Sequence, residues 1–275
     1  MVDTVRSIMS GGISRNFIVH LPTNYTIFRR YPTVLNLHGG AGNAEQHMNM
    51  CNMNVEADTQ GFIVVYPNGT GPMGKYTFNA EVCCGSAKKQ NIDDVSFLSD
   101  VITYVNRSFC SDGRFYMCGF SNGGVMTYSY AEKLSFPGKL KGISVVEAAT
   151  PGIDRTPPAI PMMQFHGLLD DHIPYEGGYG LNSLEPVDWI SVDENIAYWN
   201  KINNTSTTPL ITDSQYYTLY NYPGNSSSSK SVILYKIKGG GHTWAGGNPP
   251  PVYLGPLVSE VNINKIMLSF FKKIK

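Results

Sequence analysis

Short hydrophobic runs recur along the chain, and each is bounded by glycine, proline or polar residues. The runs are rich in β-branched and aromatic residues, so they predict β-strands. Helical periodicity appears between several of them and again near the end of the chain. Strands that alternate with helices form a mostly parallel sheet covered on both faces, and the pattern therefore predicts an α/β fold. The predicted strands are 16–21, 33–37, 62–66, 114–119, 142–146 and 161–165, and the predicted helices are 93–105, 123–133, 192–201 and 258–272.

Two segments depart from this alternation. Residues 208–222 and 231–237 predict a hairpin whose connection is the polar run 225–230, because such runs favour surface turns. Residues 176–188 are rich in glycine and polar residues and lack periodicity, which predicts a long loop. This loop would lie near the candidate catalytic residues described below, either as a lid or as a plain surface excursion. No stretch of the 275 residues resembles a linker, so we expect one domain over residues 1–275.

Charge and hydropathy narrow the range of partners. Lys plus Arg and Asp plus Glu both number 21, so no net field attracts nucleic acid or an anionic membrane. No hydrophobic run approaches the roughly 20 residues of a membrane span, and residues 1–15 lack the pattern of a signal peptide. We therefore expect neither a nucleic-acid nor a membrane partner. We also expect the chain to be a monomer.

Cysteines and glycosylation sequons bear on the compartment. Several Asn-X-Ser/Thr sequons are compatible with secretion. Cys118 lies in the hydrophobic run 114–119 and is predicted to be an inert buried thiol. The other four cysteines allow one or two disulfides, and the sequence does not rank their pairings. These four are Cys51, Cys83, Cys84 and Cys110.

The segment Gly119-Phe120-Ser121-Asn122-Gly123 matches the G-x-S-x-G pattern. In that pattern a tight turn between a strand and a helix exposes the serine hydroxyl, and glycines are required because side chains would collide there. The pattern alone is weak, since short glycine-containing motifs also arise by chance. Here a predicted strand precedes it and a predicted helix follows it, so Ser121 is predicted to be a nucleophile.

A serine nucleophile needs a histidine base that is held by a carboxylate. After a G-x-S-x-G turn the acid comes first in the chain and the histidine second. Only His166, His172 and His242 follow Ser121. His166 ends a predicted strand with no acid to serve it, and His172 lies too close in sequence to the candidate acids. His242 remains, on a loop that three preceding glycines make flexible.

Candidate acids follow the predicted strand 161–165, at the end of the strand where α/β active sites gather. Asp170 is the preferred acid, and its neighbour Asp171 is the close alternative. Glu147, which follows the preceding strand, is a distant alternative. The carboxylate would fix the imidazole tautomer and stabilise the imidazolium.

The tetrahedral intermediate also requires N–H donors aimed at its oxyanion. One donor is predicted to be the backbone N–H of Asn122, and the other that of Gly40, with Ala41 next, in the glycine-rich loop after strand 33–37. His38 in this loop is expected to be structural. Metal-binding spacings of His and Cys are absent, and the loop lacks the Lys-Ser/Thr of a phosphate loop, so we expect neither metal nor cofactor.

Seven motifs in this order resemble the secreted family of feruloyl esterases and polyhydroxybutyrate depolymerase-like carbohydrate esterases. The resemblance runs from about residue 16 to the C-terminus and implies the α/β-hydrolase fold. It places the triad on Ser121, Asp170 and His242, in agreement with the assignment from chain order. The motifs are Leu37-His38-Gly39, Val64-Val65-Tyr66-Pro67-Asn68-Gly69-Thr70, Cys83-Cys84-Gly85, Asp93-Asp94-Val95-Ser96-Phe97-Leu98, Gly119 to Gly124, His166-Gly167 and Gly240-Gly241-His242-Thr243-Trp244.

The resemblance also implies finer features. One of Cys83 and Cys84 would pair with Cys110, and Trp244 and Tyr175 would line the acyl pocket, although Trp244 could equally be a packing residue. This chain departs from the family at 78–79, where many members have a tryptophan, and in its long loop 176–188. The resemblance therefore does not fix the acyl preference.

The resemblance implies a secreted serine carboxylesterase that releases ferulic or related hydroxycinnamic acids from arabinoxylan through an acyl-enzyme. Its substrate would be a feruloylated or acylated polysaccharide or oligosaccharide. Acetylxylan esterase and polyhydroxyalkanoate depolymerase are alternatives that share the same machinery. A catalytically inactive α/β-hydrolase-fold protein that binds a glycan or a protein is the alternative from another class.

Overall fold

The computed structural model describes residues 3–133, 140–150 and 157–274. Its main strands are β1 (Thr4–Ser10), β2 (Ile13–His20), β3 (Tyr31–Leu37), β4 (Ile63–Pro67), β5 (Ser111–Phe120), β6 (Leu140–Val146), β7 (Met162–Gly167), β10 (Leu210–Asp213), β11 (Tyr217–Tyr222) and β12 (Val232–Ile237). They form one ten-stranded sheet in the order β1-β2-β4-β3-β5-β6-β7-β12-β11-β10. The strands from β4 to β12 in this order are parallel, and antiparallel pairs complete both edges.

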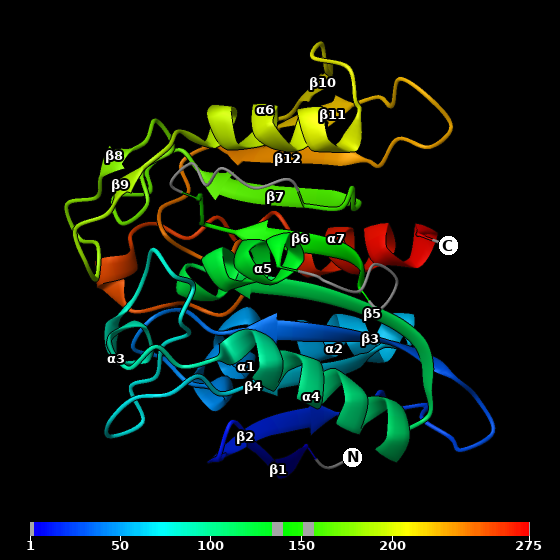
Figure 1. Cartoon of the computed structure of the whole chain (residues 1–275). Helices are drawn as coiled ribbons and strands as arrows, with labels where there is room; N and C mark the ends of the chain where they lie inside the picture. The colour runs from blue at the N-terminus through cyan, green and yellow to red at the C-terminus, as the bar shows by residue number, and fades with distance from the viewer. Residues whose placement is uncertain (1–2, 134–139, 151–156, 275) are drawn as a thin grey trace.

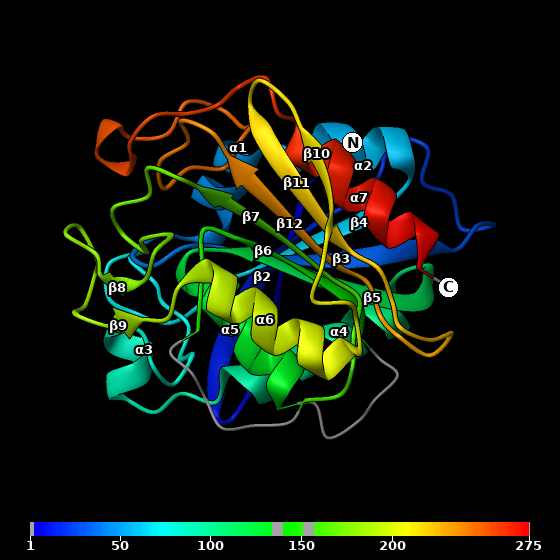
Figure 2. The same ribbon diagram turned by 90° about the horizontal axis from the view of Figure 1, so that it is seen from above.

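Helices cover both faces of the sheet (Figures 1 and 2). One face carries α4 (Asp94–Ser108), α5 (Asn122–Glu132) and α6 (Val192–Asn203). The other face carries α1 (Ala44–Cys51), α2 (Met53–Gln60) and α7 (Ile263–Lys273). The remaining elements are α3 (Gly85–Lys89), the 3-10 helix η1 (Val252–Leu254) and the small pair β8 (Gly178–Tyr179) and β9 (Asp188–Trp189).

Two hydrophobic cores lie on the two faces of the sheet, because successive side chains of a strand point to opposite sides. In β5, Phe115 and Met117 join the core under α4, α5 and α6. Tyr116 and Cys118 join the core under α1, α2 and α7. The central strands are therefore hydrophobic on both sides, which explains why the sequence showed continuous hydrophobic runs there.

All the strands and helices that the pattern predicted are present, with shifted ends. The C-terminal helix begins at Ile263 rather than at 258, because the side chain of Asn262 caps it by accepting a hydrogen bond from the Lys265 N–H. The hairpin prediction was partly wrong. Residues 208–222 contain two strands, β10 and β11, because the chain turns at Ser214, whose N–H donates to Tyr217 O at 2.9 Å.

The pattern missed α1 and α2, which lie between β3 and β4. The buried side of α1 consists of Ala44, His47 and Cys51, and these residue types give no clear hydrophobic stripe. The two helices also share Asn52, which has a φ of 51° and ends the first helix where the second begins. Tertiary packing against the sheet, more than local preference, stabilises these helices.

Candidate active site

The predicted sharp turn lies between β5 and α5. Ser121 occupies it with φ 54° and ψ −122°, a backbone conformation that non-glycine residues adopt only where the surroundings enforce it. A Cβ atom on Gly119 would lie 2.2 Å from Gly123 O, and one on Gly123 would lie 2.4 Å from Leu37 O. Both glycines are therefore required by space, as the motif predicted.

His242 and Asp170 meet at the ends of two neighbouring strands, since Asp170 follows β7 and His242 follows β12. The Nδ1 of His242 donates to Asp170 Oδ2 at 2.7 Å. The His242 ring lies 4.8 Å from the ring of Phe120, the residue before Ser121. Ser121 and His242 line one cavity, although no hydrogen bond joins their side chains within the described residues; such contacts are often long in unliganded enzymes.

The two candidate acids have different partners. Asp170 is buried, and its Oδ1 accepts the N–H groups of His172 at 2.8 Å and Ile173 at 2.9 Å. Burial favours a higher pKa for Asp170, but His242 and other hydrogen-bond donors bring it below its usual range, so the carboxylate is ionised. Asp171 instead pairs with His172 Nδ1 at 2.8 Å. The hydrogen bond to His242 is thus made by Asp170 and not by Asp171.

His166 and Glu147 lie against Asp170, which the sequence did not predict. The Nε2 of His166 is 3.4 Å from Asp170 Oδ2 and 3.6 Å from Glu147 Oε2. The expectation that His166 has no acid near it was therefore wrong, because neighbouring parallel strands bring residues distant in sequence to one end of the sheet. Burial lowers the pKa of His166, although Asp170 works in the opposite direction. A neutral His166 donates its Nε2–H to Ile173 O at 2.8 Å.

His172, which sequence reasoning set aside, is part of the site. Its ring stacks on that of His242, with centroids 4.5 Å apart and an angle of 8° between the planes. It also lines the cavity. His172 lies beside His242 because of the turn after β7, in which backbone N–H groups donate to Asp170. No spacing rule in the sequence predicts this contact.

The two predicted oxyanion donors lie side by side. A Cβ atom built on Gly40 would be 3.6 Å from Asn122 Cβ. The Asn122 side chain is fixed in the core, because its Oδ1 accepts the Phe78 N–H at 2.8 Å and its Nδ2 donates to Phe78 O at 3.0 Å. This double hydrogen bond holds the start of α5 in register with the segment before the paired cysteines. The roles of Gly40 and Asn122 as donors stay predictions.

His38 has the structural environment that the sequence led us to expect. Its Nδ1 donates to Gly39 O at 2.7 Å, and its Nε2 accepts the Gly69 N–H at 3.0 Å. Burial lowers the pKa of His38 to about 4, so the ring is neutral at physiological pH. These contacts join the loop after β3 to the segment after β4.

A cavity of about 820 Å³ is lined by Gly40, Ser121, Asn122 and His242. Hydrophobic and aromatic side chains form part of its wall, and amide side chains form another part. The first group includes Phe120, Ile173, Leu184, Trp189, Tyr253 and Leu254. The second group includes Asn43, Gln46, Asn49, Asn182 and Asn248.

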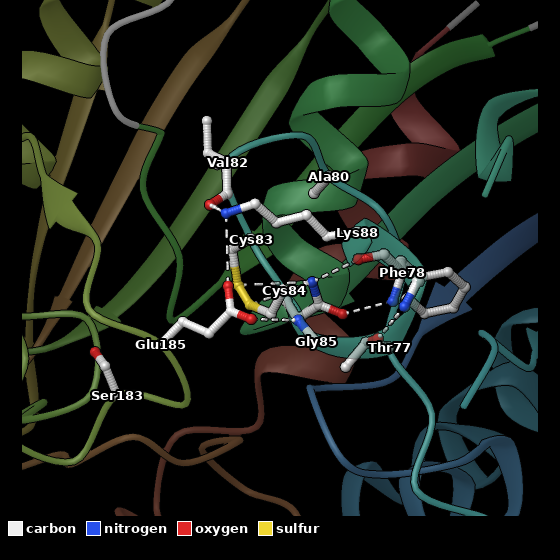
Figure 3. The surroundings of a disulfide bond; sticks show 12 residues. Thr77, Phe78, Ala80, Val82, Cys83, Cys84, Gly85, Lys88, Ser183 and Glu185 are labelled. Carbon is white, nitrogen blue, oxygen red and sulfur yellow. Dashed lines mark hydrogen bonds and ion pairs between the residues drawn. A yellow bond between two sulfur atoms is a disulfide. The ribbon is translucent and has the colours of Figure 1, made fainter. Parts of the chain in front are cut away.

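The loop 176–188 contributes to the cavity wall. Its ends pair as β8 and β9, and Asn182 Nδ2 donates to Asp171 Oδ2 at 2.7 Å. Glu185 accepts the Gly85 N–H at 2.8 Å, and these two residues face each other in Figure 3. Leu184 and Asn182 line the cavity. The loop is therefore not a plain surface excursion, and its movement as a lid stays a prediction.

The structure places Trp244 and Tyr175 away from the cavity wall, and their contact with the acyl group stays a prediction. Trp244 is buried in the core beside α7, and its Nε1 donates to Asn264 Oδ1 at 2.9 Å. Tyr175 is also buried, and its hydroxyl donates to Asp193 Oδ1. Neither residue is among those that line the cavity, whereas Trp189 is. A tryptophan next to a catalytic loop can point into the core as readily as into a pocket, and its direction is decided by packing.

The cysteine pairing stays a prediction. The sulfur atoms of the adjacent residues Cys83 and Cys84 lie together beside the cavity (Figure 3). Cys110 is free, and its Sγ donates to Ile27 O at 3.6 Å. Cys118 is a buried thiol, as predicted.

Two groups of described residues bring potential metal ligands within 4.8 Å of one another, and both contain Asp170. One adds His172 and His242, and the other adds Glu147 and His166. In both groups Asp170 Oδ2 already accepts the proton of His242 Nδ1, and in the second the His166 Nε2–H is donated to a backbone carbonyl. In each group at least one potential ligand atom is therefore already engaged in a hydrogen bond.

The sheet order and the sharp turn at Ser121 are those of the α/β-hydrolase fold. Residues 15–146 match the family model described as esterase PHB depolymerase. A feruloyl esterase B from Piromyces equi is 28% identical over 247 residues, which are 85% of this chain and 43% of that protein. The chain is thus similar to these esterases, which confirms the resemblance seen in its motifs.

Two further comparisons agree. A bifunctional acetylxylan esterase/xylanase from Neocallimastix patriciarum is 26% identical over 170 residues, which are 60% of this chain and 23% of that protein. This chain therefore spans less than half the length of both relatives. The structure of an acetyl xylan esterase from Aspergillus awamori has a TM-score of 0.60 at 14% identity, with 87% of this chain and 94% of that one covered. That likeness confirms the fold. No helix among the described residues is long and apolar enough to cross a membrane.

Proposed function

We propose that this chain is a serine carboxylesterase that releases ferulic or related hydroxycinnamic acids from plant cell-wall arabinoxylan, outside the cell. The observation that carries the proposal is the 2.7 Å hydrogen bond from His242 to Asp170, in a cavity that also contains the strained Ser121. The similarity to a protein named feruloyl esterase B supports the acyl group.

In the proposed reaction His242 Nε2 accepts the proton of Ser121 while the hydroxyl oxygen attacks the ester carbonyl. Asp170 stabilises the imidazolium that forms. The backbone N–H groups of Gly40 and Asn122 donate to the oxyanion of the tetrahedral intermediate. His242 then donates its proton to the sugar oxygen as the bond from this oxygen to the carbonyl carbon breaks, which releases the sugar hydroxyl and leaves the acyl-enzyme. His242 next activates a water molecule that hydrolyses the acyl-enzyme.

The chemistry of the cavity wall supports a feruloylated polysaccharide. A hydroxycinnamoyl group is flat and largely apolar, and Trp189, Leu184 and Ile173 give the cavity an apolar and aromatic wall. Sugar hydroxyls both donate and accept hydrogen bonds, and amide side chains do the same. Exposed amides such as Gln46 and Asn49 provide such partners.

The test compares turnover of methyl ferulate, acetylated xylan and a short hydroxybutyrate oligomer. We expect methyl ferulate to have the highest kcat/KM, and Ser121→Ala to lower its hydrolysis by about 10⁴-fold or more. Turnover of another substrate without turnover of methyl ferulate would exclude the feruloyl preference. A Ser121→Ala variant as active as the parent would contradict the catalytic assignment, and a parent that hydrolyses none of the three substrates would favour a binding protein without this chemistry.

Acetylxylan is the second candidate substrate. The observation that favours it is the similarity to the bifunctional acetylxylan esterase/xylanase, which extends over 60% of this chain. The same substrate comparison separates the two candidates, because an acetyl group leaves most of a cavity of about 820 Å³ unfilled. A preference for acetylated xylan over methyl ferulate would establish this alternative.

A further inference from the structure

Glu147 is a buried carboxyl beside Asp170 that lies outside the residues lining the cavity. It follows β6 directly and has a φ of 50°, which non-glycine residues rarely adopt. Its own N–H donates to Phe165 O at 3.0 Å, and both of its carboxyl oxygens lie 2.9 Å from the Gly167 N–H that they accept. Backbone contacts between β6 and β7 therefore hold this side chain at the end of the sheet where Asp170 lies.

The carboxyl groups of Glu147 and Asp170 are both buried, and an oxygen of each lies within 4.8 Å of the other. Two ionised carboxylates repel each other in such a buried site, and a hydrogen bond between them requires a proton on one, because an ionised carboxylate is only an acceptor. His166 contacts both groups, at 3.6 Å and 3.4 Å, but burial lowers its pKa. A neutral imidazole cannot balance a second negative charge. One of the two carboxyl groups must therefore hold a proton.

The number of donors decides which carboxyl is ionised. Asp170 accepts His242 Nδ1 and two backbone N–H groups, at distances of 2.7–2.9 Å. Among the described residues, the hydrogen bonds to Glu147 from backbone groups come from the Gly167 N–H alone. Hydrogen bonds to a carboxyl group favour its ionised form, so the anion is Asp170. We propose that Glu147 is a positioning residue, which holds a proton and donates a hydrogen bond to the catalytic acid Asp170.

This inference rests on the proposed function, because it gives Glu147 a task in the same reaction. While His242 accepts the Ser121 proton, Glu147 keeps its own proton and aims one Asp170 oxygen at the imidazole. The pair then carries one negative charge throughout. The other titratable groups that face it are His166, on β7, and His172, which stacks on His242.

The first test is the pH dependence of unfolding, which needs no substrate. Burial and the adjacent charge of Asp170 raise the pKa of Glu147 well above its usual range, so this proton is held in the folded state and lost on unfolding. Urea unfolding of the parent and of Glu147→Gln is compared at steps of one unit between about pH 5 and pH 8. We expect the unfolding constant of the parent to rise relative to the variant by up to about tenfold per pH unit.

The matched control is Glu260→Gln, which removes the same charge at an exposed position. We expect its unfolding constant to keep a constant ratio to that of the parent over this pH range. A constant ratio for Glu147→Gln as well would overturn the proposal, because it would mean that Glu147 is ionised in the folded protein.

The second test separates hydrogen-bond donation from packing. Glutamine at 147 keeps a donor for Asp170 and an acceptor for the Gly167 N–H, so we expect kcat on p-nitrophenyl acetate within about threefold of the parent. Glu147→Ala lacks the donor, and we expect kcat to fall by about 10–100-fold with KM unchanged. Equal losses in both variants would overturn the donor role. A parent without turnover would refute the proposed function but would leave the unfolding test valid.

Discussion

Replacing Asp170 by asparagine changes one oxygen of the buried carboxylate that holds His242. Asp170 Oδ1 accepts two backbone N–H groups, from His172 and Ile173, and Oδ2 accepts one N–H, from His242. The amide can keep its oxygen toward the two backbone donors, or it can flip and face them with its NH₂ group. The flipped form loses two hydrogen bonds rather than one, so the unflipped form is favoured by about 1–3 kcal/mol.

In the favoured form the amide NH₂ faces His242 Nδ1. The ring then holds its proton on Nε2 and accepts at Nδ1, so Nε2 no longer accepts the Ser121 proton. We expect kcat to fall by about 10³–10⁴-fold, which is about 4–5.5 kcal/mol of lost transition-state stabilisation. KM should change little, because Asp170 is buried outside the cavity lining.

The assay is steady-state hydrolysis of p-nitrophenyl acetate at neutral pH, with urea unfolding to show that the variant is folded. Asp171→Asn is the matched control, since it makes the same substitution one position away, at a residue that contacts His172 and Asn182 instead of His242. Its kcat should stay within about threefold of the parent. An Asp170→Asn variant within tenfold of the parent rate, or a larger loss in Asp171→Asn, would refute the assignment of the acid.

Three further changes test other parts of the structure. Gly123→Ala places a Cβ 2.4 Å from Leu37 O, so we expect about 1–3 kcal/mol less stability in urea and at least a tenfold loss of kcat; unchanged kinetics would mean that the turn tolerates a side chain. Asp94→Ala removes the carboxylate that lies 2.6 Å from the buried Arg15, and it should lower the free energy of unfolding by about 3–5 kcal/mol. A loss below about 1 kcal/mol would contradict this expectation. Leu184→Ala shortens a side chain of the cavity wall and should raise the KM for methyl ferulate by about 2–10-fold with kcat nearly constant; an unchanged KM would place the acyl group elsewhere.

The elements that the sequence predicted best are those whose cause is local. The turn at Ser121 requires glycine on both sides because the backbone approaches itself closely there, and that requirement is visible in five residues. The central strands were visible because both of their faces are buried, which leaves long hydrophobic runs. Chain order then identified Asp170 and His242, which the structure brings to 2.7 Å.

The features that the sequence missed depend on contacts between distant segments. Glu147 and His166 lie 19 positions apart in the chain, yet β6 and β7 end side by side and bring both to Asp170. The sequence left open whether Trp244 lines the pocket or packs in the core; its indole lies among the residues under α7 and donates to Asn264. The spacing of residues along one strand predicts neither the direction of a side chain in a loop nor the residue that lies beside it on the adjacent strand.

The sequence by itself determined the fold class, the nucleophile turn and the pair that would serve it, because chain order and backbone sterics act over short distances or follow the order of the strands. The tertiary structure decided which acid contacts His242, which residues form the cavity wall, and how the buried charge of Asp170 is compensated. These depend on packing in three dimensions, where a few ångströms decide whether a carboxyl group finds a donor, a cation or a second carboxyl.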